Sequence, residues 1–407
     1  MMQRYVELKE KYQDCLVFYR LGDFYEMFFD DAKIASKELQ LALTGRDCGL
    51  SERAPMCGVP HHSVNTYINK LLEKNYKVAI CEQLTDPKES KGLVERDVIR
   101  VITPGTVIED DLLSAKTNNF LAAVFFHKGV CGVAWADVST GEFNMTDVPA
   151  ELELSAVTDK LIEIRANEIL ADPAFFDRAQ RIPEYIRKQF KPLSRSDALF
   201  ADEANKKKLA ERFPDAAGQA KKHPAAWQAA AGLWAYLILT QKNTLAHMTQ
   251  LTFLDEKSTL VLDASAVRNL ELFRSMGDHG TRGTLLWLMD RTLTPMGARK
   301  LHAWMERPLR RQEEILLRLD AVEELKNDFA RRQDMIAAMT DICDIERICT
   351  RISYGTVNAR EALFMRRSLE KLPALNELLS GTQSALLQSA LKQLDPLEDL
   401  CALLTAA

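Results

Sequence analysis

The alternation of apolar and polar residues predicts short strands and helices over the first hundred positions. The apolar runs LVFY (Leu16–Tyr19) and VAIC (Val78–Cys81) are typical of buried strands. Residues 30–40 (DDAKIASKELQ) and 63–74 (SVNTYINKLLEK) have the apolar spacing of helices, and each begins with a residue type that favours an N-cap. We therefore expect a small domain of mixed α and β structure over residues 1–103.

A Pro-Gly pair then predicts a break in the chain, and residues 104–117 are typical of a linker. After the linker, the stretches LAAVFF, VCGVAWADV and GEFNMT indicate strands separated by short turns. Helical patterns follow over residues 151–165 and 227–240. Strands followed by helices predict an α/β domain over residues 118–253.

The remaining residues, 254–407, have a 3.6-residue apolar period almost throughout. It is clearest in MGARKLHAWMERP, QEEILLRLDAVEELKNDF and AREALFMRRSLEKLP. The last residues, LEDLCALLTAA, have a helical pattern without a Gly or Asn cap, so we expect the natural chain to continue. The predicted fold class is therefore multidomain, α/β plus all-α.

Composition narrows the function only slightly. The chain has 47% hydrophobic and 27% charged residues, which is ordinary for a globular protein, and its net charge is −5. This charge gives no overall attraction for nucleic acid, so any DNA contact must come from local patches. No apolar run is long enough to cross a bilayer, and the charged start does not resemble a secretory signal. The eight cysteines are scattered without a C-x-x-C pair, which predicts reduced thiols in the cytoplasm and neither a zinc site nor a disulfide framework.

The run GDFYEMFFDDA contains the most informative chemistry, an aromatic ring at Phe24 and a carboxylate at Glu26. A Phe can wedge between stacked base pairs, and a nearby Glu can hydrogen-bond a base edge that pairing leaves unsatisfied. The alternative is an amphipathic segment in which Phe24, Phe28 and Phe29 belong to the core and Glu26 faces water. For so short a motif, the alternative is the more common structure.

Longer stretches change this balance. LVFYRLGDFYEMFFDDAKIASKELQLALTGRD, APMCGVPHHSVNTYINKLLEKNYKVAICEQLTDP and SKGLVERDVIRVITPGT closely resemble the mismatch-recognition domain of the MutS family of DNA mismatch repair proteins. The resemblance continues through the family's connector (LAAVFFHKGVCGVAWADVSTGEF) and its core and lever (LDASAVRNLELF and TLTPMGARKLHAWMERPL). It covers nearly the whole chain and is loosest over residues 172–224.

The resemblance implies roles for particular residues. Phe24 is expected to enter the minor groove and stack on one mismatched base, and Glu26 to hydrogen-bond that base. Secondary DNA contacts are expected at Arg46, Met56, Pro60, His62 and Arg100. No catalytic residue and no metal ligand is expected in this chain.

The resemblance also implies an architecture and partners. We expect a mixed α/β mismatch-binding domain, a ribonuclease-H-like connector and a truncated helical core and lever. The expected partners are mismatched or looped-out duplex DNA, MutL and a second copy in a homodimer, in the bacterial cytoplasm at the nucleoid and without a membrane. ATP and Mg²⁺ would bind a C-terminal ATPase domain. Because no G-x-x-x-x-G-K-[ST] occurs here, we expect this chain to be no enzyme and to hold no cofactor.

Several alternatives are open. Asp137 in a strand-like run, with Glu168 and Asp172, allows a ribonuclease-H-like nuclease. A module that binds MutL without recognising mismatches is the other alternative function. His61-His62 could suggest a metal site, but adjacent residues on a strand point to opposite faces. The glycines of MGDHGTRGTLL predict a turn, and the Arg-rich helices beyond it predict solvated faces with i,i+4 ion pairs.

Overall fold

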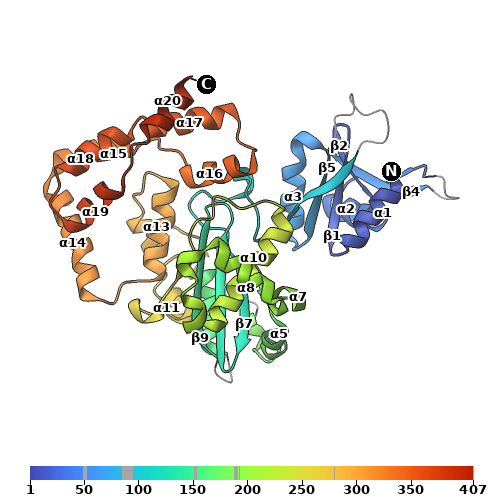
Figure 1. Cartoon of the computed structure of the whole chain (residues 1–407), viewed down its shortest axis with the longest axis horizontal. Helices are drawn as coiled ribbons and strands as arrows, with labels where there is room; N and C mark the ends of the chain where they lie inside the picture. The colour runs from blue at the N-terminus through green and yellow to red at the C-terminus, as the bar shows by residue number, and fades with distance from the viewer. Residues whose placement is uncertain are drawn as a thin grey trace. The chain divides into compact units, whose positions relative to one another are not determined.

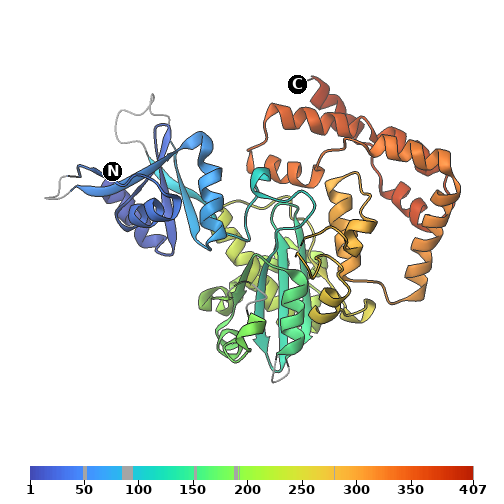
Figure 2. The same cartoon turned by 180° about the vertical axis from the view of Figure 1, so that it is seen from behind.

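The computed structural model describes residues 1–48, 53–84, 95–150, 154–187, 191, 193–278 and 280–406. The chain forms two compact units, coloured by residue number in Figures 1 and 2. The first comprises residues 1–113, 119–154 and 165–251, and the second residues 114–118, 155–164 and 252–407. The mixed α/β start and the helical end of the chain agree with the predicted fold class. The predicted domain boundaries stay predictions.

A six-stranded mixed sheet opens the first unit, with the strand order β3-β4-β2-β1-β5-β6. Strand β1 pairs antiparallel with β2 and parallel with β5, and the remaining neighbours are antiparallel. The strands are β1 (Cys15–Leu21), β2 (Phe24–Phe28), β3 (Thr44–Arg46), β4 (Ala54–Pro60), β5 (Lys77–Gln83) and β6 (Arg96–Ile102). The helices are α1 (Met2–Lys11), α2 (Phe29–Leu39) and α3 (Val64–Glu73), with a short 3₁₀ turn, η1 (His61–Ser63), before α3. The two apolar runs predicted as strands are confirmed as the centres of β1 and β5.

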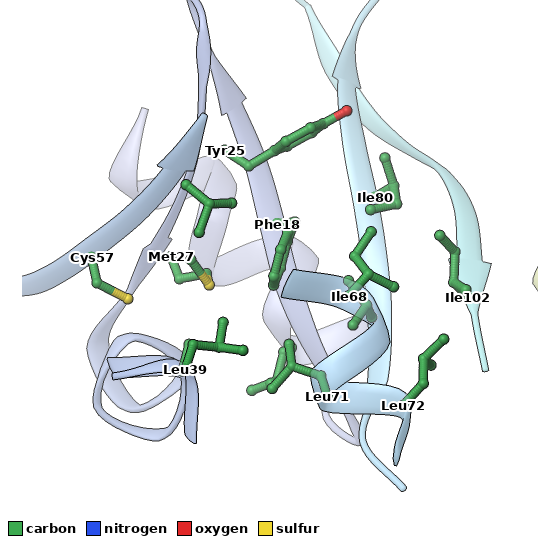
Figure 3. Packing of buried hydrophobic residues seen from close by; sticks show 14 of the residues in the cluster. Phe18, Tyr25, Met27, Leu39, Cys57, Ile68, Leu71, Leu72, Ile80 and Ile102 are labelled. Carbon is green, nitrogen blue, oxygen red and sulfur yellow. The ribbon is translucent and has the colours of Figure 1, made fainter. Parts of the chain in front are cut away.

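The two faces of this sheet are covered differently. Helices α2 and α3 pack on one face over a core that includes Phe18, Tyr25 and Met27 (Figure 3). Helix α1 contributes Tyr5 and Leu8 to a second core on the opposite face. Because side chains alternate along a strand, neighbouring residues of β2 enter different environments.

The predicted N-cap of helix α2 is wrong, whereas Ser63 does occupy the N-cap position of α3, without a side-chain cap. Helix α2 begins at Phe29, so Asp30 lies inside it, and the capping position is Phe28, without a side-chain cap. Ser63 precedes α3, but its hydroxyl donates to the carbonyl of Pro60 (3.4 Å) instead of accepting a helix N–H. Helix α2 has no side-chain cap because the chain passes directly from β2 into the helix, with no residue in between.

The same unit contains five neighbouring strands of a second sheet, in the order β11-β10-β7-β8-β9. Strands β7, β8 and β9 form an antiparallel meander, and β10 and β11 add to it in parallel. The strands are β7 (Leu121–His127), β8 (Val130–Asp137), β9 (Glu142–Pro149), β10 (Glu168–Ala171) and β11 (Leu193–Arg195). The three predicted strands of the meander are confirmed. The finer description as ribonuclease-H-like stays a prediction.

Helix α10 (Pro224–Gln241) is apolar on all sides and largely buried against this meander. Gly132 of β8 permits the close approach, since a Cβ there would lie 2.0 Å from the backbone of Ala225. Figure 1 shows α10 and α8 beside the sheet, and Figure 2 shows the strands from behind. The other helices of this region are α5 (Pro173–Ala179), α6 (Glu184–Arg187), α7 (Asp197–Ala201), α8 (Glu203–Arg212) and α9 (Gln219–Lys222).

The second unit is helical, as predicted, around a core that includes Ile348, Met365 and Leu369. Its helices are α4 (Ser155–Ile164), α11 (Ala264–Asn269), α12 (Leu285–Met289), α13 (Pro295–Glu306), α14 (Gln312–Asn327), α15 (Phe329–Met339), α16 (Ile345–Tyr354), α17 (Ala359–Leu369), α18 (Leu372–Ser380), α19 (Ala385–Gln393) and α20 (Glu398–Ala406). A short strand, β12 (Thr252–Phe253), precedes α11 in the chain.

The prediction of solvated arginines on these helices is only partly right. Arg366 does form an i,i+4 pair with Glu370 (3.3 Å). Arg299, however, is 5% exposed and binds both carboxylate oxygens of Asp344 (2.7 and 2.8 Å). The partner belongs to another part of the chain, so the spacing of charges along one helix could not reveal this pair.

Candidate nucleic-acid interface

Phe24 and Glu26 lie at the start of strand β2, which forms a tight hairpin with β1. Leu21 pairs with Phe24, so only Gly22 and Asp23 connect β1 to β2. Gly22 has φ +58°, in the left-handed region that favours glycine. The carbonyl of Asp23 accepts a hydrogen bond from the backbone N–H of His61 (2.8 Å). The hairpin tip is thereby tied to the segment after β4.

The strand register gathers most of the predicted DNA contacts on one face of the sheet. Directly opposed residues of an antiparallel ladder share a face, as do residues two apart on one strand. The ladder pairs Phe24 with Pro60, Glu26 with Gly58, Phe28 with Met56 and Arg46 with Ala54. The shared face therefore carries Phe24, Glu26, Arg46, Met56 and Pro60.

Phe24 is 46% exposed, although it lies in a β-strand beside buried aromatic residues. The alternative prediction, that these phenylalanines belong to the core, holds for Phe28, which is fully buried, and is wrong for Phe24. Helix α1 covers the shared face at Phe28, where the ring of Tyr5 packs edge-on with ring centroids 5.1 Å apart. A large apolar side chain is thus presented to solvent on a rigid strand, which is the arrangement that a wedge requires.

Glu26 forms an ion pair with Arg46, in which the Arg46 guanidinium donates to Oε2 over 2.6 Å. The side chain of Glu26 is 18% exposed and that of Arg46 is 39% exposed. The two residues lie on β2 and β3, which are separated by β4. Glu26, the candidate base contact, is therefore already paired with Arg46. Arg46 is the one arginine among the predicted DNA contacts that lies on the same face of the sheet.

Tyr25 fixes β2 from the opposite face of the sheet. It is 4% exposed, its ring points across the core toward β5 in Figure 3, and its hydroxyl donates to the carboxylate of Glu82. Burial, together with the hydrogen bond to Glu82, raises the pKa of Tyr25 above its usual range, so the hydroxyl stays a neutral donor. The Arg20 guanidinium lies over the same ring, 5.4 Å from its centroid. These contacts hold the strand that presents Phe24 and Glu26.

Two predicted contacts lie apart from this group. His62 is exposed in η1, after Pro60. Arg100 is 8% exposed on β6, at the opposite edge of the sheet from β3. Its guanidinium donates within the protein to Glu109 (2.7 Å), the Thr106 carbonyl (2.7 Å) and Gln241 (2.9 Å). The sequence did not reveal these partners.

Gly58 is a site residue that sequence reasoning missed. It pairs with Glu26, and a Cβ at this position would lie 3.4 Å from Glu26 Cγ and 3.2 Å from the Tyr25 carbonyl. A glycine inside a strand often marks the close approach of another group, and this signal was present in the CGVP run.

The carboxylates of the nuclease alternative have structural partners. Asp137 is fully buried and accepts hydrogen bonds from the backbone N–H groups of Ser139 (2.8 Å) and Asn119 (3.0 Å). Glu168 accepts from the hydroxyl groups of Tyr236 and Thr103.

Asp172 caps helix α5 by accepting from the N–H groups of Ala174 and Phe175. Burial raises the pKa of Asp172, although its backbone hydrogen bonds oppose the shift. Across the described residues, no group of three or more His, Cys, Asp or Glu side chains has an arrangement that could hold a metal ion. The nuclease alternative therefore has no carboxylate cluster to support it in this part of the chain.

Comparison with known proteins places the chain in a family. Models described as MutS domain I, MutS domain II and MutS domain III match residues 1–111, 119–249 and 265–407. The DNA mismatch repair protein MutS of Desulforamulus reducens is 42% identical over 98% of this chain and 46% of its own length. That of Lachnoclostridium phytofermentans is 42% identical over 98% of this chain and 43% of its own length. That of Clostridium kluyveri is 40% identical over the whole of this chain and 46% of its own length.

The fold and the shared face thus define a multidomain protein with an exposed aromatic residue beside a paired carboxylate. The chain belongs to the MutS family of DNA mismatch repair proteins. It spans about half the length of the curated relatives it matches. Among the helices that the structure describes, none combines the length and apolar character needed to cross a membrane.

Proposed function

We propose that this chain binds duplex DNA at mismatched or looped-out base pairs, with Phe24 as a stacking wedge and Glu26 as the base contact. The observation that carries the proposal is the 46% exposure of Phe24 on a strand whose other face is locked into the core. An idle phenylalanine at this position would gain from burial, as Phe28 does.

A wedge can distinguish mismatched from matched duplex DNA because the free-energy cost of opening a base stack differs between the two. Unstacking costs a few kcal/mol in paired DNA and less at a mismatch. A side chain that inserts in the same way everywhere therefore binds more tightly where the stack is already weak. Phe24 needs no contact with a specific base edge for this step.

Glu26 supplies a polar contact that the ring cannot make. Its carboxylate can accept a hydrogen bond from a base N–H that mispairing has left exposed. To face a ring nitrogen that is itself an acceptor, the carboxyl group would have to carry a proton. Met56 and Pro60, on the same face, are proposed to line the DNA around the wedge, and the exposed His62 to contact it from the turn after Pro60.

The test is the binding of this chain to a G·T heteroduplex and to the matched homoduplex at low salt, where weak phosphate contacts still hold the DNA. We expect a preference for the heteroduplex that Phe24→Ala removes, with a loss of about tenfold or more in heteroduplex affinity. Val6→Ala is the matched control, because Val6 is also exposed (42%) but lies on α1. It should keep the preference.

If the unsubstituted chain binds both duplexes equally, the same pair is tested on a chain extended to the length of its relatives. Equal binding there would contradict the proposal. Retained MutL binding in that case would instead support an interaction module without mismatch recognition.

For the whole protein we propose the family's further properties. These are a homodimer, contact with MutL, and an ATP-driven switch to a sliding clamp, with ATP and Mg²⁺ bound in a C-terminal ATPase domain. The proposed location is the bacterial nucleoid. Membership of the family supports each of these proposals, and each would be tested on the extended chain.

A further inference from the structure

We propose that Arg46 determines mismatch specificity by holding the Glu26 carboxylate, in addition to any contact that it makes with DNA. The inference rests on the proposed function, because it concerns how Glu26 reaches a base. Its starting point is the ion pair over 2.6 Å between two residues that lie on different strands, with a third strand between them.

The sheet is built to permit this pair. Arg46 and Glu26 share a face, and β4 lies between their strands with Gly58 directly opposite Glu26. Because Gly58 has no side chain, no Cβ of β4 lies directly opposite Glu26. Arg46, which pairs with Ala54 of β4, reaches Glu26 Oε2 from the far side of that strand. A Cβ at Gly58 would lie 3.2 Å from the Tyr25 carbonyl oxygen, a tight contact, and 3.4 Å from Glu26 Cγ, at the edge of ordinary van der Waals contact.

The pair also solves an electrostatic problem. A carboxylate beside a duplex is repelled by the phosphates, and this repulsion is the same for matched and mismatched DNA. A guanidinium on the carboxylate cancels the charge, so Glu26 can approach the bases without that cost. Cancelling this repulsion raises the affinity for both duplexes alike. Selectivity would come from geometry: Arg46 donates to Oε2 and so fixes the carboxylate, and we expect Oε1 to make the base contact. In this proposal Arg46 is a positioning residue for the base contact.

A purely phosphate-binding Arg46 makes a different prediction. It would strengthen binding to both duplexes by the same factor, and its effect would not depend on residue 26. The two roles are separated by substituting both residues singly and together, with selectivity defined as the ratio of homoduplex to heteroduplex dissociation constants.

The experiment compares the unsubstituted protein with Arg46→Gln, Glu26→Gln and the double variant on the G·T heteroduplex and its homoduplex. It is run on this chain and on the chain extended to the length of its relatives. We expect Arg46→Gln to lower selectivity by about tenfold when Glu26 is present. In the Glu26→Gln background, Arg46→Gln should leave selectivity unchanged. Glu26→Gln should also restore part of the homoduplex affinity that Arg46→Gln loses, because it removes the unpaired charge.

Two further variants control for charge and geometry. Arg46→Lys keeps a cation that can reach Oε2 and should retain most of the selectivity. Arg53→Gln removes an exposed cation near Arg46. The Arg53 Cβ would lie 3.1 Å from a Cβ placed on Gly45, the residue that precedes Arg46. It should weaken both duplexes alike, with or without Glu26.

The outcomes are distinguishable. If Phe24→Ala removes the preference but Arg46→Gln weakens both duplexes equally in both backgrounds, the proposed function stands and the role of Arg46 is wrong. If no protein, of either length, prefers the heteroduplex, the proposed function fails and this inference fails with it.

Discussion

Phe24 and Phe28 lie on the same face of strand β2, yet Phe24 is 46% exposed and Phe28 is fully buried. Tyr5 of helix α1 packs against the ring of Phe28, with centroids 5.1 Å apart. The helix thus covers one end of this sheet face and leaves the other end open. Two phenylalanines in one short motif consequently have different roles, one in stability and one on the surface.

Substituting each phenylalanine by alanine should separate these roles. Phe28→Ala should lower the free energy of unfolding by about 3–5 kcal/mol, because it leaves a cavity in the core. Phe24→Ala should change it by only about 0.5 kcal/mol, as exposed positions usually do. Urea unfolding followed by far-UV circular dichroism measures the free energy of unfolding of both variants. If Phe24→Ala lowered the free energy of unfolding as much as Phe28→Ala does, Phe24 would be a core residue.

Gly58→Ala should reduce mismatch selectivity with little loss of stability. The added methyl group would lie 3.2 Å from the Tyr25 carbonyl oxygen, so the β2 backbone next to Glu26 must adjust, and 3.4 Å from Glu26 Cγ, where it limits the freedom of that side chain. Alanine is otherwise favoured over glycine in a strand by about 0.5–1 kcal/mol, which offsets part of the strain. Binding to the two duplexes and the thermal midpoint report the two effects.

Gly218→Ala is the matched control for Gly58→Ala, since a Cβ at Gly218 would have open space within 4 Å. It should alter neither selectivity nor the thermal midpoint by much. Unchanged selectivity in Gly58→Ala would mean that Glu26 does not need the space beside this glycine.

The local elements were predictable from sequence, but the contacts between distant residues were not. The apolar runs at the centres of β1 and β5 indicate buried strands because their partners need only be apolar. The pairing of Glu26 with Arg46 depends on the register of three strands, which no local pattern specifies. The family resemblance named both residues as DNA contacts, and only the fold showed that they contact each other.

Arg100 illustrates the same limit in a different way. Its place in a strand next to other charged residues is compatible with a DNA contact. The structure places its guanidinium against Gln241, which is 141 residues further along the chain. Secondary-structure patterns carry no information about such a partner, so a buried polar cluster and a solvated arginine have the same sequence signature.

Arg100→Gln should therefore lower stability without changing the salt dependence of DNA binding. Three internal hydrogen-bond partners, Glu109, Thr106 and Gln241, would lose a charged donor, and such losses cost about 1–3 kcal/mol each at buried positions. The slope of log affinity against log salt should stay the same. A decrease of about one in that slope would show that Arg100 neutralises a phosphate.

Asp137→Asn tests the remaining catalytic alternative. The carboxylate accepts from the N–H groups of Asn119 and Ser139, and an amide that replaces one oxygen with a donor leaves one of them unpaired. We expect a loss of about 1–3 kcal/mol in stability. Incubation of DNA or RNA–DNA hybrids with Mg²⁺ or Mn²⁺ should give no cleavage with either protein. Metal-dependent cleavage that disappears in Asp137→Asn would instead support a nuclease.

His247 should make the free energy of unfolding of the part of the chain that contains strands β7–β11 decrease in mild acid. Its Nε2 lies 2.9 Å from the carbonyl of Val138, and burial lowers the pKa of His247 despite that hydrogen bond, with the charge of Arg212 adding to the decrease. A lowered folded-state pKa means that the unfolded chain takes up the proton first. The contribution of His247 to stability is thus fully present above its unfolded pKa of about 6.5 and is lost as the pH falls through the folded value.

The expected loss is at most about 1.4 kcal/mol per pH unit below the unfolded pKa, the limit for one proton. His247→Gln keeps an N–H donor for the Val138 carbonyl but cannot titrate, so its stability should vary less between pH 7.5 and pH 5 than that of the unsubstituted protein. His62→Gln is the control, because His62 is exposed. The measurement is the urea midpoint of unfolding at a series of pH values. If the midpoint varied with pH in the same way for all three proteins, His247 would titrate normally in the folded state.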